Sequence, residues 1–136
     1  IEDLSGNALA SAQAIQFTTG AGVDLLAPSV VTRSPFSGAT NVPLNTVVLV
    51  EFSERLNPLT LTSETNVATI ALRDNSTGQF VSSTLGLSAD GRTLSITPTA
   101  LLTANRQYTV YLTYNTYPED LAGNRHSSSF TFRTVP

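Results

Sequence analysis

The sequence contains no cysteine, methionine, tryptophan or lysine, and several of these absences exclude a kind of chemistry. Without cysteine the chain can form no disulfide, no thiolate metal site and no thiol nucleophile. His126 is the single histidine, which excludes metal sites built from several histidines and leaves a serine–histidine–aspartate triad only one residue as its base. His126 lies in the polar stretch Arg125–Ser129, and no G-x-S-x-G motif is present, so we expect an exposed loop residue.

Charge is also scarce. Only 12% of the residues are charged, the net charge is −3, and the seven basic residues are arginines spread from Arg33 to Arg133. Because no basic patch is available for a phosphate backbone, we expect no nucleic acid partner. The longest apolar run, 46–52, is interrupted by Glu51 and is far shorter than a membrane helix, so we expect no membrane insertion. A chain of 136 residues with 40% hydrophobic residues suits one ordered core.

A short motif occurs twice and frames the chain. Glu2–Asn7 reads E-D-L-S-G-N and Glu119–Asn124 reads E-D-L-A-G-N, and each copy precedes an alternating stretch, 15–19 and 130–134 respectively. The terminal strand thus occurs twice, whereas the sequence between the two copies occurs once. This predicts that residues 1–24 hold the terminal strand of a preceding module plus a linker, and that 25–136 form a complete module. The chain opens on this turn motif rather than on a signal peptide, so we expect it to be part of a longer polypeptide.

Apolar residues alternate with polar ones in seven segments, which is the pattern of half-buried strands. Phe52 and Phe132 lie on the apolar faces of two of them, and we expect both in the core. The segments are Val30–Thr32, Val48–Phe52, Ala68–Leu72, Val81–Leu87, Leu94–Ile96, Tyr108–Leu112 and Phe130–Phe132. About seven short strands in one domain predict an all-β, immunoglobulin-like sandwich of antiparallel strands with Greek-key connections.

Turn residues support this division. The stretches 74–78 and 88–91 both end in glycine, which takes the positive φ that hairpin loops need, so both are expected to be hairpins. Tyr108 begins a strand after an irregular stretch, where sandwich folds often place a tyrosine whose hydroxyl binds the backbone. Asp120, Gly123 and Asn124 have the residue types of a corner-closing turn, in which Gly123 supplies positive φ and Asn124 tolerates a left-handed conformation.

Five motifs follow one another in an order that is specific when taken together. They are Ser34–Pro43, Val50–Glu54 with Leu56–Pro58, Asp90–Pro98, Leu102–Val110, and Asp120–Asn124 followed by Phe130–Thr134. In this order the chain resembles the bacterial Ig-like domains of the S-layer-protein (SbsA) type, from about residue 25 to 135. The resemblance implies a repeated building block of S-layer proteins, adhesins and secreted enzymes. It does not imply catalysis.

The opening turn followed by Phe52-Ser53-Glu54 is also similar to periplasmic copper carriers of the CopC type. That resemblance would imply copper ligation by histidine and, in some members, methionine. Because methionine is absent and His126 stands alone, the copper-binding residues have no counterparts in this chain.

Two further binding hypotheses stay open. Glu119 and Asp120 could contribute oxygen ligands to a calcium ion, although calcium takes six or more ligands and the local sequence supplies fewer. Tyr111, Tyr114 and Tyr117 could form an aromatic strip that stacks on sugar rings, although core or edge protection is the simpler role for them. Glu51 and Glu54 flank Phe52, but Glu51 points away from its face, so we expect surface residues rather than an acid–base pair.

Taken together, the sequence predicts a non-catalytic structural module in a tandem array on a bacterial cell surface or secreted protein, with neighbouring modules of the same chain as its partners. A carbohydrate- or ligand-binding accessory module of a secreted enzyme is the alternative. No cofactor is expected beyond the calcium hypothesis. Residues 1–20 carry a terminal strand without its module, so they could add to an exposed sheet edge of a second copy and form a homodimer.

Overall fold

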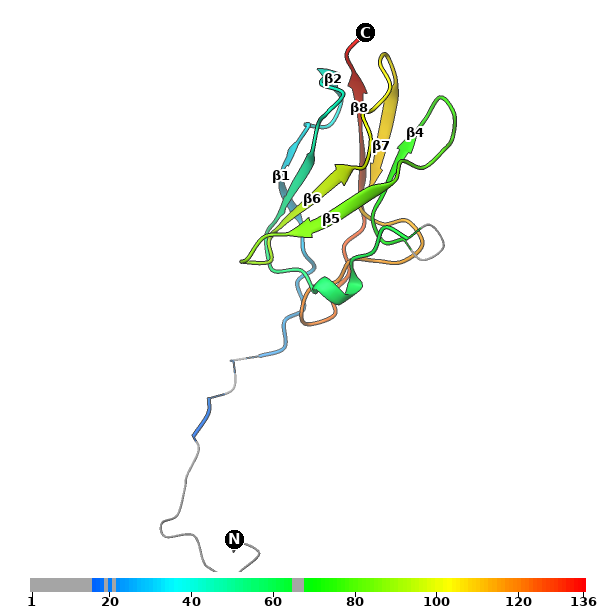
Figure 1. The fold of residues 1–136 in the computed structure, drawn as a ribbon. Coiled ribbons are helices and arrows are strands. Elements are labelled where there is room, and N and C mark those ends of the chain that lie inside the picture. Colours follow the sequence, from blue (N-terminus) through cyan, green and yellow to red (C-terminus); the bar gives the residue numbers. More distant parts are fainter. Residues whose placement is uncertain (1–15, 19, 21, 65–67) are drawn as a thin grey trace, which may run out of the picture.

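The computed structural model describes residues 16–18, 20, 22–64 and 68–136, and the first copy of the repeated motif lies outside them. The described chain forms two four-stranded sheets packed face to face (Figure 1). The elements are β1 (Val30–Ser34), β2 (Ala39–Val42), β3 (Val48–Phe52), the 3-10 helix η1 (Pro58–Thr60), β4 (Ala71–Asp74), β5 (Ser83–Leu87), β6 (Thr93–Pro98), β7 (Gln107–Tyr111) and β8 (Ser129–Thr134). Among these residues no helix is long and apolar enough to cross a membrane.

The sheet orders are β1-β3-β6-β5 and β2-β8-β7-β4. Only the β5–β6 and β7–β8 connections stay within one sheet, and every other connection between the described strands crosses to the opposite layer. This arrangement confirms the predicted all-β immunoglobulin-like sandwich. Crossing connections place residues from distant parts of the sequence at the same end of the molecule, where the candidate site is found.

Strand β2 was not among the expected strands, and it pairs with β8 in parallel rather than antiparallel. Its buried residues, Ala39 and Val42, are separated by two exposed ones, and the register shifts between them. Asn41 has a positive φ of 55°, which places an irregularity within the strand. The irregularity removes the period-two pattern by which a strand is recognised from sequence.

The turn at 74–78 closes a short antiparallel hairpin, in which the N–H of Asp74 donates to the carbonyl of Gln79 at 2.9 Å, but the pairing does not continue into the next strand. Strand β4 pairs with β7 and β5 pairs with β6, so the turn carries the chain from one sheet to the other, with a single bridge between Arg73 and Phe80. Gly78 does take positive φ, as the turn residues predict. Local turn chemistry fixes the reversal of the chain but does not decide which strand is paired afterwards. The second turn, 88–91, does join paired strands, β5 and β6.

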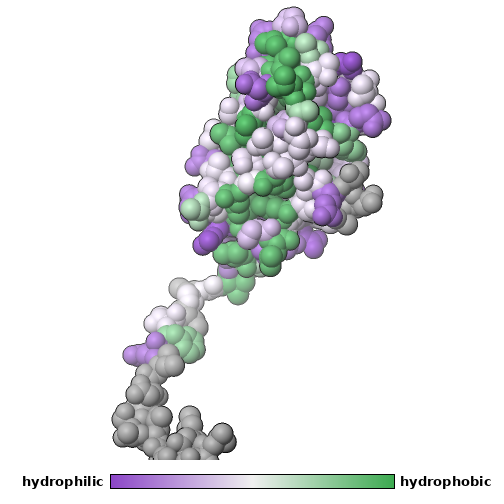
Figure 2. All heavy atoms as spheres, in the orientation of Figure 1, coloured by the Kyte–Doolittle hydropathy of each residue, from purple (hydrophilic) through white to green (hydrophobic). Residues whose placement is uncertain are grey.

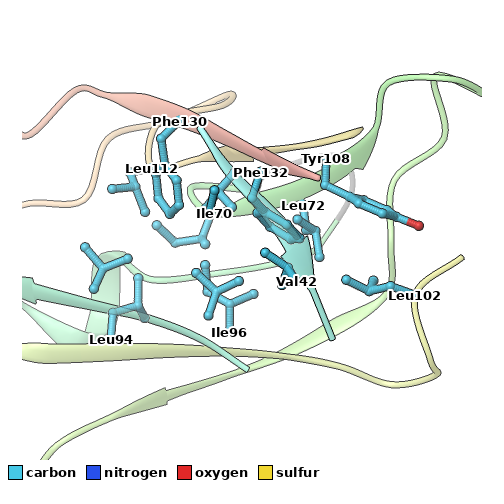
Figure 3. Close-up of a cluster of buried hydrophobic side chains, with 14 of the residues drawn as sticks. Val42, Ile70, Leu72, Leu94, Ile96, Leu102, Tyr108, Leu112, Phe130 and Phe132 are labelled. Carbon is cyan, nitrogen blue, oxygen red and sulfur yellow. The ribbon is translucent and has the colours of Figure 1, made fainter. Parts of the chain in front are cut away.

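The core lies between the two sheets (Figure 3). In β3, Val48, Val50 and Phe52 are buried while Leu49 and Glu51 are exposed. Alternate residues of this strand therefore face the core and the solvent. From the opposite sheet Phe132 reaches the same core and is stacked on Tyr108, with ring centroids 5.6 Å apart. The buried apolar set includes Leu56, Ile70, Leu72, Leu94, Ile96, Leu102, Val110, Leu112 and Phe130.

Tyr108 anchors the corner before β7. Its ring is buried, and its hydroxyl oxygen accepts a hydrogen bond from the backbone N–H of Thr103 at 2.9 Å. The hydroxyl therefore fixes the irregular stretch 99–106 onto the strand that follows it.

We expect Tyr108→Phe to lower the free energy of unfolding by about 1 kcal/mol, because one buried hydrogen bond is lost while the ring keeps its packing. Urea denaturation measures the change. Tyr117→Phe, in a half-exposed tyrosine, is the control and should leave the stability within about 0.5 kcal/mol. Equal effects of the two substitutions would contradict the anchoring role.

Of the predicted terminal strand at 15–19, the structure describes Gln16–Thr18, which carry no strand, and the Phe17 side chain is exposed. The described part of the segment is therefore not paired with an edge of its own module.

Strand addition between two copies stays a prediction. We expect light scattering to give a dimer mass for the 136-residue chain and a monomer mass after deletion of residues 1–20. An unchanged mass on deletion would rule out the intermolecular pairing.

Candidate functional site

Polar side chains gather at the end of the module where the chain enters it. Three segments meet there: the connector (residues 22–29), η1, and the loop 112–128 between β7 and β8, as Figure 1 shows. We call this region the entry end. The bridge between Leu56 and Asp120 and the hydrogen bond from the N–H of Asn57 to the carbonyl of Glu119 join the η1 side to the loop.

A turn centred on Asp120 organises the loop. Asp120 is only 2% exposed, and its Oδ1 accepts the backbone N–H groups of Ala122 at 2.7 Å and Asn124 at 2.9 Å. Gly123 has a φ of 90°, in the region that favours glycine. Burial alone would raise the pKa of Asp120, but the hydrogen bonds from Asn124 and the neighbouring backbone outweigh it and hold the pKa below its usual value.

Asn124 connects the turn to the connector through its side chain. Its Nδ2 donates to Oδ2 of Asp120 at 2.8 Å and to the carbonyl oxygen of Asp24 at 3.1 Å. Its backbone φ is not positive, so the turn does not use the left-handed conformation that asparagine tolerates. The side-chain amide of Asn124 supplies two N–H donors, one for the Asp120 carboxylate in the turn and one for the Asp24 carbonyl in the connector.

Three carboxylates, those of Asp24, Glu54 and Asp120, lie at the entry end with their nearest oxygens within 4.8 Å of one another. Desolvation, followed by the negative charges of Asp24 and Asp120, raises the pKa of Glu54. The cluster joins residues far apart in the sequence, which is why sequence reasoning assigned Glu54 only to the surface and gave Asp24 no role.

The cluster differs from the calcium pair that the sequence suggests. Asp120 belongs to it, whereas Glu119 accepts a hydrogen bond from Arg125 at 3.0 Å as part of a surface ion pair. Carboxylate oxygens are the ligands that calcium prefers, but the three oxygens that approach one another here, one from each residue, supply half or less of the six to eight that it takes. Both oxygens of Asp120 also accept hydrogen bonds, Oδ1 from the backbone of Ala122 and Asn124 and Oδ2 from the Asn124 side chain.

His126 is buried, and the expectation of an exposed loop residue is wrong. Its ring packs edge-on against Phe52, with centroids 5.2 Å apart. Nδ1 lies 2.7 Å from the carbonyl oxygen of Pro28, 98 residues away in the sequence, and Nε2 lies 2.7 Å from Oγ of Ser128. The long-range partner explains the error, since the neighbouring sequence is entirely polar.

The hydrogen bonds define the state of the His126 ring. A carbonyl oxygen only accepts, so Nδ1 carries the proton, and in the neutral ring Nε2 accepts from the Ser128 hydroxyl. Burial lowers the pKa of His126 below its usual value, the hydrogen bond to Pro28 opposes that change, and the charge of Arg33 adds to it. Nδ1 therefore holds the connector against the loop, and Nε2 fixes the ring within the loop itself.

The three tyrosines do not form one strip. Tyr111 and Tyr114 have ring centroids 5.6 Å apart at an angle of 59°, and Phe80 meets Tyr114 at 4.8 Å and 65°. Tyr117 instead contacts the guanidinium of Arg125, 5.4 Å from the ring centroid. Phe80 and Tyr114 line a cavity of about 80 Å³ between the sheets. Because adjacent rings are tilted against one another, they offer no flat platform for a sugar ring.

Substituting Asp120 tests the turn. We expect Asp120→Ala to lower the free energy of unfolding by about 2 kcal/mol, because charge-assisted hydrogen bonds to Ala122 and Asn124 are lost. Glu119→Ala is the matched control and should cost no more than about 0.5 kcal/mol, since it removes only a surface ion pair. Thermal unfolding of both variants measures the difference, and equal losses would contradict the assigned role.

Fold and site together define an immunoglobulin-like β-sandwich module whose corner turn holds the entering chain. Residues 24–134 match the model of a bacterial Ig-like domain family. The chain belongs to that family. No curated protein sequence matches the chain.

Solved structures with a similar fold include an S-layer protein, CopC and a copper resistance protein. The S-layer protein SbsC is 20% identical with a TM-score of 0.57, and the match covers 81% of this chain but only 14% of that one. CopC from Methylosinus trichosporium OB3b is 19% identical with a TM-score of 0.63, covering 80% and 94% of the two chains. PcoC, a methionine-rich copper resistance protein from Escherichia coli, is 16% identical with a TM-score of 0.60, covering 77% and 95%. At these identities the likeness shows the fold alone.

Proposed function

We propose that this chain is a non-catalytic structural module that spaces or presents other domains in a tandem array of a bacterial cell-surface or secreted protein. Membership of the bacterial Ig-like family and the likeness to an S-layer protein support this role. The neighbouring modules of the same polypeptide are its partners in this proposal.

One observation carries the proposal. The polar residues that could have served chemistry at the entry end hold the incoming chain instead: Asn124 binds the carbonyl of Asp24, and His126 binds the carbonyl of Pro28. Ser29 adds a third attachment, its N–H donating to Oγ of Ser53 at 3.0 Å. A module whose buried polar groups fix the direction of its connector is suited to setting the geometry between domains.

Replacing the module in the full-length parent protein tests the proposal. An unrelated β-sandwich of equal length in place of residues 24–134 should preserve surface display and the activities of the other domains, whereas deletion should shorten their reach from the cell. If replacement abolished a binding activity while surface display stayed intact, the module would have a binding role in addition to that of a spacer.

The alternative, a carbohydrate-binding accessory module, is tested with the isolated chain on a polysaccharide panel. Tyr111 and Tyr114 are the rings that lie together, and Tyr117 is the matched control because its ring contacts Arg125. We expect no binding. Reproducible binding that Tyr111→Ala abolishes and Tyr117→Ala retains would overturn the structural role in favour of the accessory one.

A further inference from the structure

Large apolar side chains face solvent at the entry end, beside the polar residues that fix the connector. Their exposed fractions range from 64% to 93%. The set is Val23, Leu25, Leu26, Leu59 and Leu121. Hydrophobic residues are visible at this end of the molecule in Figure 2. Single exposed apolar residues are ordinary, but a group of them at one end marks an interaction surface.

The exposed apolar side chains come from all three segments of the entry end. Leu121 lines a shallow hollow together with Gly22 and the carboxylates of the acidic cluster. Leu59 projects from η1, whose N-cap residue, Asn57, binds the carbonyl of Glu119 in the loop. The apolar side chains therefore come from the connector, η1 and the loop, which hydrogen bonds hold together.

The connector leaves little freedom to whatever precedes it. Hydrogen bonds fix it from Asp24 onward, whereas residues 15–19 repeat the alternating pattern that ends this module at 130–134. The chain advances only about five residues from Thr19 to Asp24, and a fully extended chain of that length spans at most about 17 Å. A module that ended at Thr19 would have to lie directly over the entry end.

We propose that the entry end is an intermodule joint, in which Leu59, Leu121 and the apolar connector residues pack against the C-terminal end of a preceding immunoglobulin-like module. The inference rests on the proposed function, because it takes the array as given and adds that its joint is rigid. Interfaces between domains of one chain commonly bury about 600–1,500 Å². The hydrogen bonds of Asn124 and His126 then set the angle at which the two modules meet.

The experiment compares the 136-residue chain with a longer piece of the parent polypeptide that includes the whole preceding module. Leu59→Ser with Leu121→Ser removes the joint surface. Leu101→Ser is the matched control, because Leu101 is also largely exposed but belongs to the stretch beside the C-terminal residues, at the opposite end. Calorimetry reports the melting temperature of this module, and NMR relaxation reports whether the two modules tumble together.

We expect the two-module protein to tumble as one body. In it the double substitution should lower the melting temperature of this module by about 3–6 °C and release the modules to tumble separately, while Leu101→Ser changes neither. In the 136-residue chain the double substitution should leave the melting temperature unchanged, which also shows that the variant folds.

Independent tumbling of the unsubstituted two-module protein would overturn the joint, as would equal effects of the double substitution and Leu101→Ser. Self-association of the 136-residue chain that the double substitution abolishes would also overturn it, because the surface would then bind a second copy. A flexible joint leaves the spacer proposal intact, since the replacement experiment in the parent protein tests that proposal separately.

Discussion

Phe132→Ala is expected to lower the free energy of unfolding by about 3–5 kcal/mol, because it removes a large aromatic ring from the centre of the core. Phe132 is 1% exposed and lies in β8, the strand that β2 and β7 flank. Its ring is stacked on Tyr108, whose hydroxyl anchors the corner before β7. Truncation therefore leaves a cavity where both sheets meet, and the neighbouring rings can collapse into it only in part.

Urea denaturation, analysed as a two-state transition, measures this loss. Phe36→Ala is the matched control, because Phe36 is the same residue type and its side chain is largely exposed, so its truncation should cost less than about 1 kcal/mol. A loss below about 1 kcal/mol for Phe132→Ala would mean that β8 does not turn this face to the core.

The orientation of Phe132 was predictable because the alternation in β8 is uninterrupted. The same holds for β3, where Phe52 points inward and Glu51 outward, as the period-two pattern indicates. Strand β2 could not be recognised in this way, since the irregularity at Asn41 places two exposed residues between two buried ones. The strand that pairs with β4 could not be predicted either, because the sequence of the turn after β4 does not specify which sheet the next strand joins.

At the candidate site, too, some features could be predicted from the local sequence and others could not. The turn around Asp120 and Gly123 follows from residues adjacent in the sequence, and local rules for turns predict it. The acidic cluster could not be predicted from neighbouring residues, because Asp24, Glu54 and Asp120 come together only when the fold brings three distant segments to one end. No local pattern distinguishes Glu54 from any other glutamate at the end of a strand.

The acidic cluster has a mixed dependence on pH. The pKa of Asp120 is lowered in the folded state, so its contribution to stability is present above its ordinary value of 3.8 and is lost as the pH falls through the folded value. The pKa of Glu54 is raised, so its ionisation opposes folding as the pH rises above its ordinary value of 4.5. The two contributions have opposite signs and change in different pH ranges, that of Asp120 below 3.8 and that of Glu54 above 4.5.

His126 gives the clearest pH dependence, and its substitution is the second large effect we expect. At about pH 8 His126→Ala should lower the free energy of unfolding by about 2–3 kcal/mol, because two hydrogen bonds and the packing against Phe52 are lost. Ser127→Ala is the control, since Ser127 is the exposed neighbour in the same loop, and should cost less than about 0.5 kcal/mol.

The effect of His126→Ala should shrink in acid. The pKa of His126 is lowered in the folded state, so below its ordinary value of 6.5 the unfolded chain binds a proton that the folded chain does not. The stability that depends on the neutral ring is therefore complete above pH 6.5 and is lost as the pH falls below it, toward the folded pKa. Urea denaturation of both proteins between about pH 8 and about pH 5 measures the difference. A difference that stays constant over this range would show that His126 does not titrate differently in the two states. A negligible loss at the alkaline end would show that its hydrogen bond to the Pro28 carbonyl does not hold the connector.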